Sequence, residues 1–333
     1  MKKINEKDYL TISARIHAME NRLLARERMD RLMEVGSTEE AARVLSECGY
    51  PELSELNLGG IERMLAAARN ELRKDLRESA PDPAVVDLFF LPNDYHNVKV
   101  LLKASATGQD ADRLFIDCGR YSAAQLKEEI LQGTLQNETA VFAQAVAAAA
   151  KALDQDGSPQ AADQILDRAC YAEMLDMSQE TGSAFLEGYV RLSIDCVNLR
   201  TTVRCRRIDC GPDYLKSALL PGGTIDCGEF LSVAAGTLDL KDLIGHGFPA
   251  ETVSSDRTGL TDDGLMQFER FCSRVLKAYF AKAKNASFGE QSLIGYLYAK
   301  LSEFTTVRVI LTGRLAGLDA EAIRERLGDL YAG

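Results

Sequence analysis

Three short segments of this chain place a basic residue five positions after an acidic one. The pairs are Asp94 with Lys99, Asp195 with Arg200, and Glu303 with Arg308. A carboxylate and a cation that met in one pocket could carry out acid–base chemistry. The same groups could instead join helices through ion pairs. The positions of the neighbouring residues favour the second use.

Each segment continues the same pattern beyond its charged pair. An Asn or Thr follows the acidic residue by three positions, as Asn97, Asn198 and Thr306, and mostly aliphatic residues follow by four, seven and eight. Offsets of four, seven and eight share one face of an α-helix, so each segment can bury an apolar stripe. Residues five apart point in different directions on a helix. We therefore predict that these acids and bases contact neighbouring helices or solvent, as architectural groups.

The three signatures predict three copies of one helical unit. Their nearly even spacing suggests subdomains at about 1–110, 111–215 and 216–333. A second echo, Ile-Asp-Cys-Gly, follows the first signature at 116–119 and the second at 225–228, but it also occurs at 208–211, which leaves its register open. The third signature has Glu303 and Thr306 where the others have Asp and Asn, so the units are not fully equivalent.

No other set of residues makes a convincing reactive site. The chain has no GxxxxGK[ST], HExxH, GxSxG or GxGxxG motif, and its histidines, His17, His96 and His246, are separate in sequence. Asp262-Asp263 could contribute to a divalent-metal site, but the next acid is Glu269, so a helix cap is the better interpretation. We predict no catalytic, cofactor-binding or metal site.

The pattern of helix formers, caps and breakers predicts an all-α fold without period-two strands. An amphipathic helix is expected over 8–34, a buried helix or extended linker over 86–91, and capping boxes at Ser37 and Ser122. Asn137 is expected to cap an alanine-rich helix, and Pro159 to open the next. The remaining long helices are expected near 60–79, 185–208, 265–284 and 292–312, with a terminal helix from about 319.

Composition and charge limit the possible partners. The 333 residues are 46% hydrophobic and carry 39 basic and 50 acidic side chains, for a net charge of −11, which disfavours nucleic acid and anionic lipid. Arg204, Arg206 and Arg207 are interpreted as a solvated or inter-subunit face. No segment reaches the roughly 20 apolar residues of a membrane span, and no secretory signal is evident. The eight cysteines, without a CxxC pair, are expected to be reduced cytoplasmic thiols.

Four motifs give the chain a resemblance to a known family. They are Tyr9 with 13–23 (Ser-Ala-Arg-Ile-His-Ala-Met-Glu-Asn-Arg-Leu), the first signature at 94–102, Leu-Pro-Gly-Gly-Thr-Ile-Asp at 220–226, and Thr-Thr-Val-Arg-Val-Ile-Leu-Thr at 305–312. Their order along the whole chain resembles the family of V/A-type ATPase stalk proteins known as the C subunit in prokaryotes and as the d subunit in the eukaryotic vacuolar enzyme.

The resemblance implies a funnel-like socket of three helical subdomains and a non-catalytic role. In the family, this protein lies on the cytoplasmic face of the membrane rotor ring of ion-carrying subunits and receives the D and F shaft subunits. The chain would then transmit torque as a peripheral cytoplasmic component that meets the membrane only through the ring. Two alternatives are a free-standing helical-repeat scaffold for soluble partners and a helical enzyme that uses Asp262-Asp263.

Overall fold

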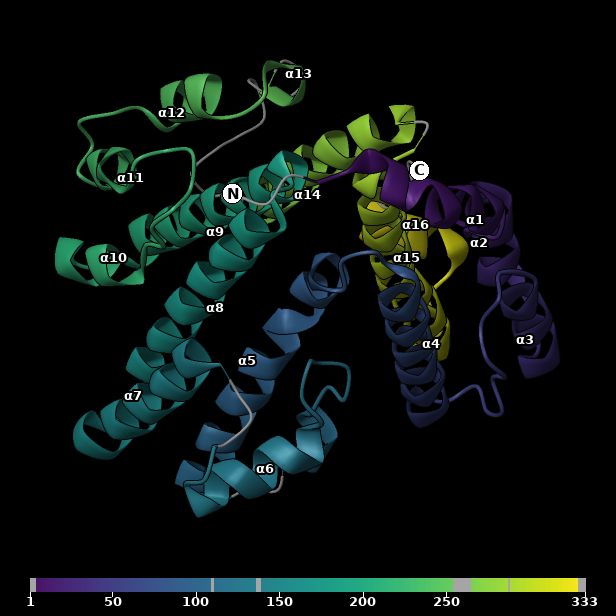
Figure 1. The fold of residues 1–333 in the computed structure, drawn as a ribbon, viewed down its shortest axis with the longest axis horizontal. Helices are drawn as coiled ribbons and strands as arrows, with labels where there is room; N and C mark the ends of the chain where they lie inside the picture. Colours follow the sequence, from purple (N-terminus) through teal and green to yellow (C-terminus); the bar gives the residue numbers. More distant parts are fainter. Residues whose placement is uncertain (1–3, 109–110, 136–138, 254–264, 287, 329–333) are drawn as a thin grey trace. The chain divides into compact units, whose positions relative to one another are not determined.

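The computed structural model describes residues 4–108, 111–135, 139–253, 265–286 and 288–328, and these contain helices and no strand. This confirms the predicted all-α class. The chain forms two compact units, one containing Asp87–Tyr279 and the other Asn5–Val86 together with the chain from Phe280. The predicted boundaries near residues 110 and 215 stay a prediction. Figure 1 shows the helices in chain order.

The unit that joins the two ends of the chain is built around its longest helix, α15 (Glu290–Leu315). Helices α1, α2, α4 and α16 all pack against it. Its elements are η1 (Glu6–Tyr9), α1 (Leu10–Glu20), α2 (Arg26–Glu34), α3 (Thr38–Glu47), α4 (Leu58–Ser79), η3 (Lys282–Asn285), α15 and α16 (Ala320–Leu327).

The other unit packs α7 along α8, α8 along α9, and a group of short helices near α9. Its elements are α5 (Ala84–Thr107), η2 (Asp112–Leu114), α6 (Ala123–Gln132), α7 (Ala140–Asp156), α8 (Pro159–Thr181), α9 (Ala184–Ile208), α10 (Pro212–Ala218), α11 (Cys227–Ala234), α12 (Leu240–Gly247), α13 (Ala250–Val253) and α14 (Leu265–Ala281). Pro159 opens α8, as predicted.

The single helix predicted over 8–34 is wrong, because the chain leaves helical geometry between α1 and α2. The Leu24 backbone N–H donates to the Glu303 carboxylate at 2.6 Å instead of to a carbonyl of its own helix. A buried acceptor from α15 therefore replaces helical bonding at this point. The apolar stretch 86–91 is helical, and α5 continues through Pro92.

The predicted caps have different outcomes. Ser37 accepts from the Glu40 N–H and opens α3, as predicted. Ser122 precedes α6 but makes no side-chain cap bond, so the predicted capping box is wrong there. Instead, the Ala123 N–H at the start of α6 donates to the Asp117 carboxylate at 3.1 Å. Asn137 lies outside the described residues, and Thr139 caps α7.

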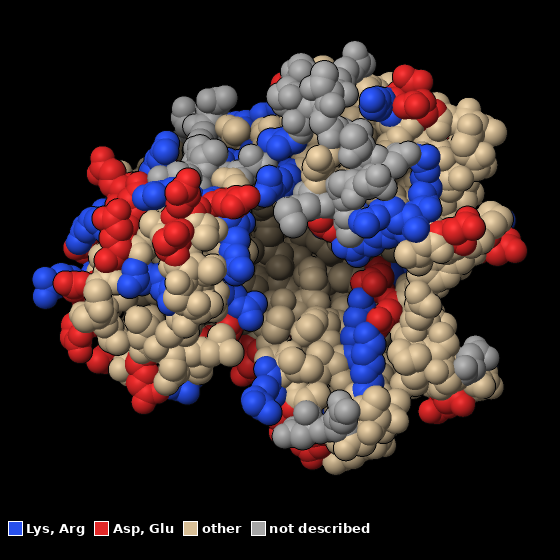
Figure 2. Space-filling view, turned by 180° about the vertical axis from the view of Figure 1, so that it is seen from behind, with Lys and Arg blue, Asp and Glu red and all other residues tan. Residues whose placement is uncertain are grey.

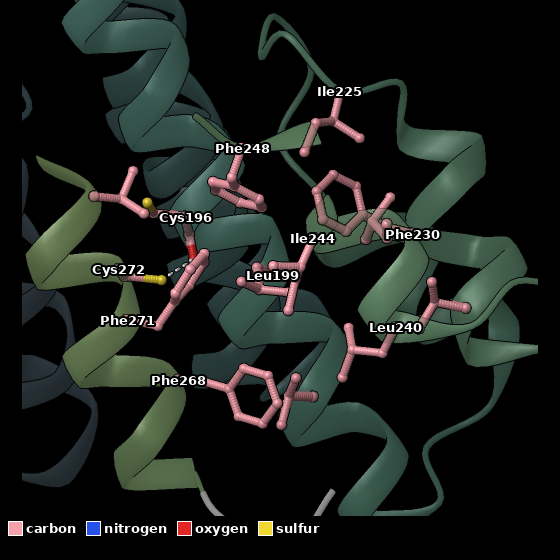
Figure 3. Close-up of a cluster of buried hydrophobic side chains, with 14 of the residues drawn as sticks. Cys196, Leu199, Ile225, Phe230, Leu240, Ile244, Phe248, Phe268, Phe271 and Cys272 are labelled. Carbon is pink, nitrogen blue, oxygen red and sulfur yellow. Dashed lines mark hydrogen bonds between the residues drawn. The ribbon is translucent and has the colours of Figure 1, made fainter. Parts of the chain in front are cut away.

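The core of the α9 side is a cluster of aromatic and aliphatic side chains from α9, α11, α12 and α14 (Figure 3). Phe230, Phe268 and Phe271 are fully buried in it, and Leu199 faces them from α9. Burying a side chain of this size contributes roughly 1.5–3 kcal/mol. The aliphatic positions of the second signature are therefore a packing surface. At the molecular surface, Figure 2 shows acidic and basic side chains next to each other in several places, separated by wide areas of uncharged residues.

Candidate functional site

Asp94 fixes the segment that follows α5 by accepting from its backbone. Its carboxylate accepts from the N–H groups of Arg120 at 3.1 Å and Tyr121 at 3.3 Å, and it is fully buried. A Cβ on Gly119 would overlap the Asp94 carboxylate, so this close approach requires glycine. We call this arrangement, a buried carboxylate that accepts from two successive backbone N–H groups after a glycine, a carboxylate clamp.

Asn97, one turn along α5, holds the same segment with its amide. Its Oδ1 accepts from the Ile116 N–H at 2.8 Å, and its Nδ2 donates to the Ile116 carbonyl at 2.9 Å. One side chain thus satisfies both polar groups of a peptide unit that has no helical partner. Asp94 and Asn97 together dock residues 116–121 against the helix.

Arg120 links the first clamp to a second buried carboxylate. Its guanidinium contacts Asp94 at 3.2 Å and Glu173 of α8 at 2.9 Å. Glu173 also accepts from the Tyr95 hydroxyl at 2.8 Å and the Thr139 hydroxyl at 2.8 Å. Burial raises the pKa of the Asp94 carboxyl, and the adjacent Arg120 charge and N–H bonds offset part of this shift.

Asp195 of α9 builds a second clamp with the same backbone pattern. Its carboxylate accepts from the N–H groups of Thr224 at 3.0 Å and Ile225 at 3.1 Å, and a Cβ on Gly223 would overlap it. Asn198 repeats the amide pairing, accepting from the Leu220 N–H and donating to its carbonyl, each at 2.8 Å.

The charge balance of this second clamp is different. Thr224 occupies the place after the clamp glycine that Arg120 occupies in the first clamp. Burial raises the pKa of the Asp195 carboxyl to about 6, although the N–H groups of Ile225 and Thr224 act in the opposite direction. Backbone dipoles are thus the main compensation for this buried charge.

Glu303 of α15 joins its helix to the N-terminal part of the chain. One carboxylate oxygen accepts from the Leu24 N–H at 2.6 Å, and the other accepts from the Tyr50 hydroxyl at 2.7 Å and contacts Lys300 Nζ at 2.5 Å. Burial, together with the Glu303 charge, raises the pKa of Tyr50. Thr306 donates to the Ser302 carbonyl within its own helix. The Glu303 carboxylate accepts from one backbone N–H, that of Leu24, whereas each clamp carboxylate accepts from two.

The basic member of each signature reaches a carboxylate on another helix. Lys99 contacts Asp167 of α8 at 2.5 Å, Arg200 contacts Glu269 of α14 at 2.9 Å, and Arg308 contacts Glu62 of α4 at 2.7 Å. This confirms the prediction that the acid and base of one signature do not pair with each other. Each signature helix is tied by its acid to a loop segment and by its base to a helix.

The arrangement offers positioning groups rather than a reaction centre. Within the described parts of the chain, no group of three or more His, Cys, Asp or Glu side chains could hold a metal ion. His96 contacts the Leu114 carbonyl, and His246 contacts Glu229, whose hydrogen bond raises the pKa of His246. Asp262-Asp263 lies outside the described residues. In the segments that the structure describes, no helix is long and apolar enough to cross a membrane.

Sequence reasoning missed the partners of the signatures. Arg120 and Glu173 were not singled out, and Gly119 and Gly223 were named only within the echo at 116–119 and the motif at 220–226. The Ile-Asp-Cys-Gly echo is a partial signal, because its first copy ends at Gly119. Its second copy at 225–228 is out of register, since the structural counterpart of Gly119 is Gly223. A search for a glycine 25–28 residues after each acid would have found both clamps.

The prediction that all cysteines are reduced thiols is wrong for one pair. Cys205 and Cys210 form a disulfide, with their Cα atoms 5.1 Å apart. The turn at the end of α9 brings them together, and the five-residue spacing was the tightest in the sequence. The other six cysteines are free.

The fold and the clamps define an all-helical protein whose buried polar groups have structural roles. Comparison with known proteins identifies its family. Residues 12–326 match the family described as ATP synthase (C/AC39) subunit, so the chain belongs to that family. Membership makes it an accessory component of a V/A-type ATPase complex rather than an enzyme by itself, as predicted.

Relatives of the same kind match along nearly their whole length. The chain is 23% identical to the C subunit of the V-type sodium ATPase of Enterococcus hirae, over 97% of this chain and 99% of the relative. It is 26% identical to the C subunit of the V-type ATP synthase of Thermus thermophilus, with coverages of 96% and 98%. The C subunit of the A-type ATP synthase of Thermococcus onnurineus is 25% identical, with coverages of 95% and 89%.

Proposed function

We propose that this chain is the central-stalk component that joins the D and F shaft subunits to the membrane rotor ring. It would transmit torque during ion transport, as a peripheral protein on the cytoplasmic face that reaches the membrane through the ring. The observation that carries the proposal is the tying of each signature helix to two other segments, by a buried acid on one side and by an ion pair of the base on the other.

Torque transmission requires that an applied force move the protein as a body. Long helices packed at native density resist deformation. The clamps add directional bonds between each signature helix and a loop that could otherwise slide, and buried polar networks of this kind make one arrangement more favourable than others. The chemistry of the signatures therefore supports a stiff coupler.

The contacts also support three similar subdomains. The first two clamps share the glycine, the pair of N–H donors and the amide pairing, at α5 and α9. Glu303 makes the corresponding contact to the N-terminal segment. These shared contacts support the three predicted subdomains, at about 1–110, 111–215 and 216–333.

Purification of the intact complex tests the proposed coupling. An affinity-tagged chain should recover the ring, D and F subunits from detergent-solubilised membranes. Chemical cross-linking of that complex should join this chain to both the ring and the shaft. Recovery only in soluble assemblies that lack ring subunits would instead support a free-standing helical-repeat scaffold.

A clamp variant provides a matched control for that purification. Asp195→Ala removes a buried carboxylate and is expected to reduce recovery of the assembled complex. Lys216→Ala changes an exposed side chain of α10 and should leave recovery unchanged. Equal recovery of the complex with both variants would show that the second clamp is not needed for assembly.

A further inference from the structure

The end of α9 carries the disulfide between Cys205 and Cys210. Cys205 is almost fully buried against the α9 core, whereas Cys210 is half-buried. Of the free cysteines in the described chain, five are buried and Cys227 is half-buried. The pair therefore differs from the other thiols in being both close together and partly open to solvent.

The backbone turn at the end of α9 itself brings the two cysteines close together. Asp209 caps α9 in the left-handed region, at φ 52°, and is the one non-glycine residue with positive φ in the part of the chain that the structure describes. This turn directs the Cys210 N–H onto the Cys205 carbonyl at 3.1 Å. The reduced pair would remain close enough to re-form the bond.

The turn leads directly into α10, which connects α9 to α8. Gln160 Nε2 donates to the Tyr214 hydroxyl at 2.7 Å, and Arg168 donates to the Leu219 carbonyl at 3.1 Å. A covalent link across the turn fixes the direction in which α10 leaves α9. Its loss would leave α10 held by the turn, the buried Leu215 and the hydrogen bonds to α8.

The surroundings of the pair suit an anionic reactant. Arg204, Arg206 and Arg207 are exposed beside it, and Ile208 at the turn is 73% exposed. Glu269 neutralises Arg204 at 2.7 Å and Asp209 lies in the turn, so the attraction of the reactant comes chiefly from Arg206 and Arg207. Clustered cations raise the local concentration of a small molecule that carries carboxylates. Because the disulfide closes a loop of only a few residues, it restricts the unfolded chain little and adds little to stability. Partly exposed disulfides are also the ones most readily reduced by thiols.

We propose that Cys205 and Cys210 form a reversible redox clasp that exchanges with glutathione-type disulfides and locks the α9–α10 corner when oxidised. One cysteine thiolate attacks a sulfur of the small-molecule disulfide, which forms a mixed disulfide and releases one thiolate. The other cysteine thiolate then attacks the protein-bound sulfur, closes the protein disulfide and releases the second thiolate. Overall, the two protein thiols give up two electrons and two protons, and the small-molecule disulfide takes up both to become two thiols.

Equilibration of the full-length protein in glutathione buffers tests the clasp. After thiol alkylation and mass spectrometry, the 205–210 pair should pass reversibly from two alkylated thiols to none across the buffer range. Cys210→Ser should abolish this transition, and Cys227→Ser should leave it intact. Hydrogen exchange of amides 210, 211 and 213–216 should be on the order of tenfold slower in the oxidised protein.

Three results would overturn the proposal. Both cysteines could remain alkylated in fully oxidised glutathione, or the bond could resist fully reduced glutathione. Exchange of the α10 amides could also be equal in the two redox states, which would reject locking of the corner. None of these results depends on binding to the ring or the shaft, so they leave the proposed coupling role separately testable.

Discussion

The two clamps hold their loops in the same way but balance their buried charges differently. Asp94 accepts two backbone N–H groups and also contacts Arg120, which continues to Glu173. Asp195 accepts the same two kinds of N–H group, with Thr224 in the place of Arg120. The backbone pattern is the shared part, and the side chain after the clamp glycine is free to vary.

The comparison shows that the same backbone pattern can hold a loop with two different ways of compensating the buried carboxylate. The first clamp contains a buried ion-pair network, in which removal of one charge leaves others uncompensated. The second contains one carboxylate compensated chiefly by backbone dipoles, and its pKa is raised to about 6. The first clamp should therefore depend strongly on its cation, Arg120, whereas the second should depend little on Thr224 at the same place.

The largest expected effect comes from Arg120→Ala in the first clamp. The substitution leaves Asp94 and Glu173 buried without their cation, which costs roughly 3–5 kcal/mol of the free energy of unfolding. Thr224→Ala, the matched change in the second clamp, should cost about 1 kcal/mol. Urea unfolding of the two variants measures the contrast, and equal losses would contradict the charge comparison.

Substitution of the clamp glycines should affect both clamps alike. A Cβ at Gly119 or Gly223 meets the carboxylate, so Gly119→Ala and Gly223→Ala should each cost roughly 1–3 kcal/mol. Gly211→Ala is the control, because no atom lies within 4 Å of a Cβ there. Thermal unfolding compares the three variants, and a loss in only one clamp would show that the two do not share the same close approach.

The raised pKa of Asp195 predicts a pH effect on the stability of the second clamp. The folded chain keeps this proton up to about pH 6, whereas the unfolded carboxyl releases it near its ordinary value of 3.8. Stabilisation from the proton is complete below the unfolded pKa and is lost as pH rises through 6. From pH 7 to pH 5, wild type should therefore gain on the order of 1 kcal/mol relative to Asp195→Asn.

The control for this pH effect is built into the comparison. Other carboxyl groups titrate in both proteins, so the difference between wild type and variant isolates Asp195. The free energy of unfolding is measured by urea at each pH. A difference that stays constant between pH 7 and pH 5 would show that the Asp195 pKa is ordinary.

The smallest effect is expected from the signature bases. Asp167, the partner of Lys99, is half-exposed, and a solvent-screened pair of this kind contributes at most about 1 kcal/mol. Lys99→Ala should therefore lower the free energy of unfolding by less than any change described above. A loss as large as that of Arg120→Ala would show that the bases, rather than the acids, hold the subdomains together.

Local patterns allowed most of the helices to be predicted, because helix periodicity, caps and prolines act over a few residues. The break between α1 and α2 could not be predicted this way. It depends on Glu303, which is remote in sequence and captures the Leu24 N–H. The Ser122 cap failed for a similar reason, since Asp117 reaches the helix start from the preceding loop.

The candidate site was only half visible in the sequence. Asp94 and Asn97 stood out because Asp195 and Asn198 repeat them at the same spacing. Their partners are mostly backbone groups, which carry no sequence signal. Arg120 could not be found by repetition either, because the second clamp has Thr224 in its place.

Ion transport measured beside ATP hydrolysis tests the central claim most directly. Membrane vesicles that carry the ATPase would be depleted of this chain and then supplied with the purified protein. The coupling role predicts that ATP-driven ion uptake is lost on depletion, that hydrolysis by the ATP-handling head persists, and that uptake returns with the added chain. Unchanged ion uptake in depleted vesicles would contradict it.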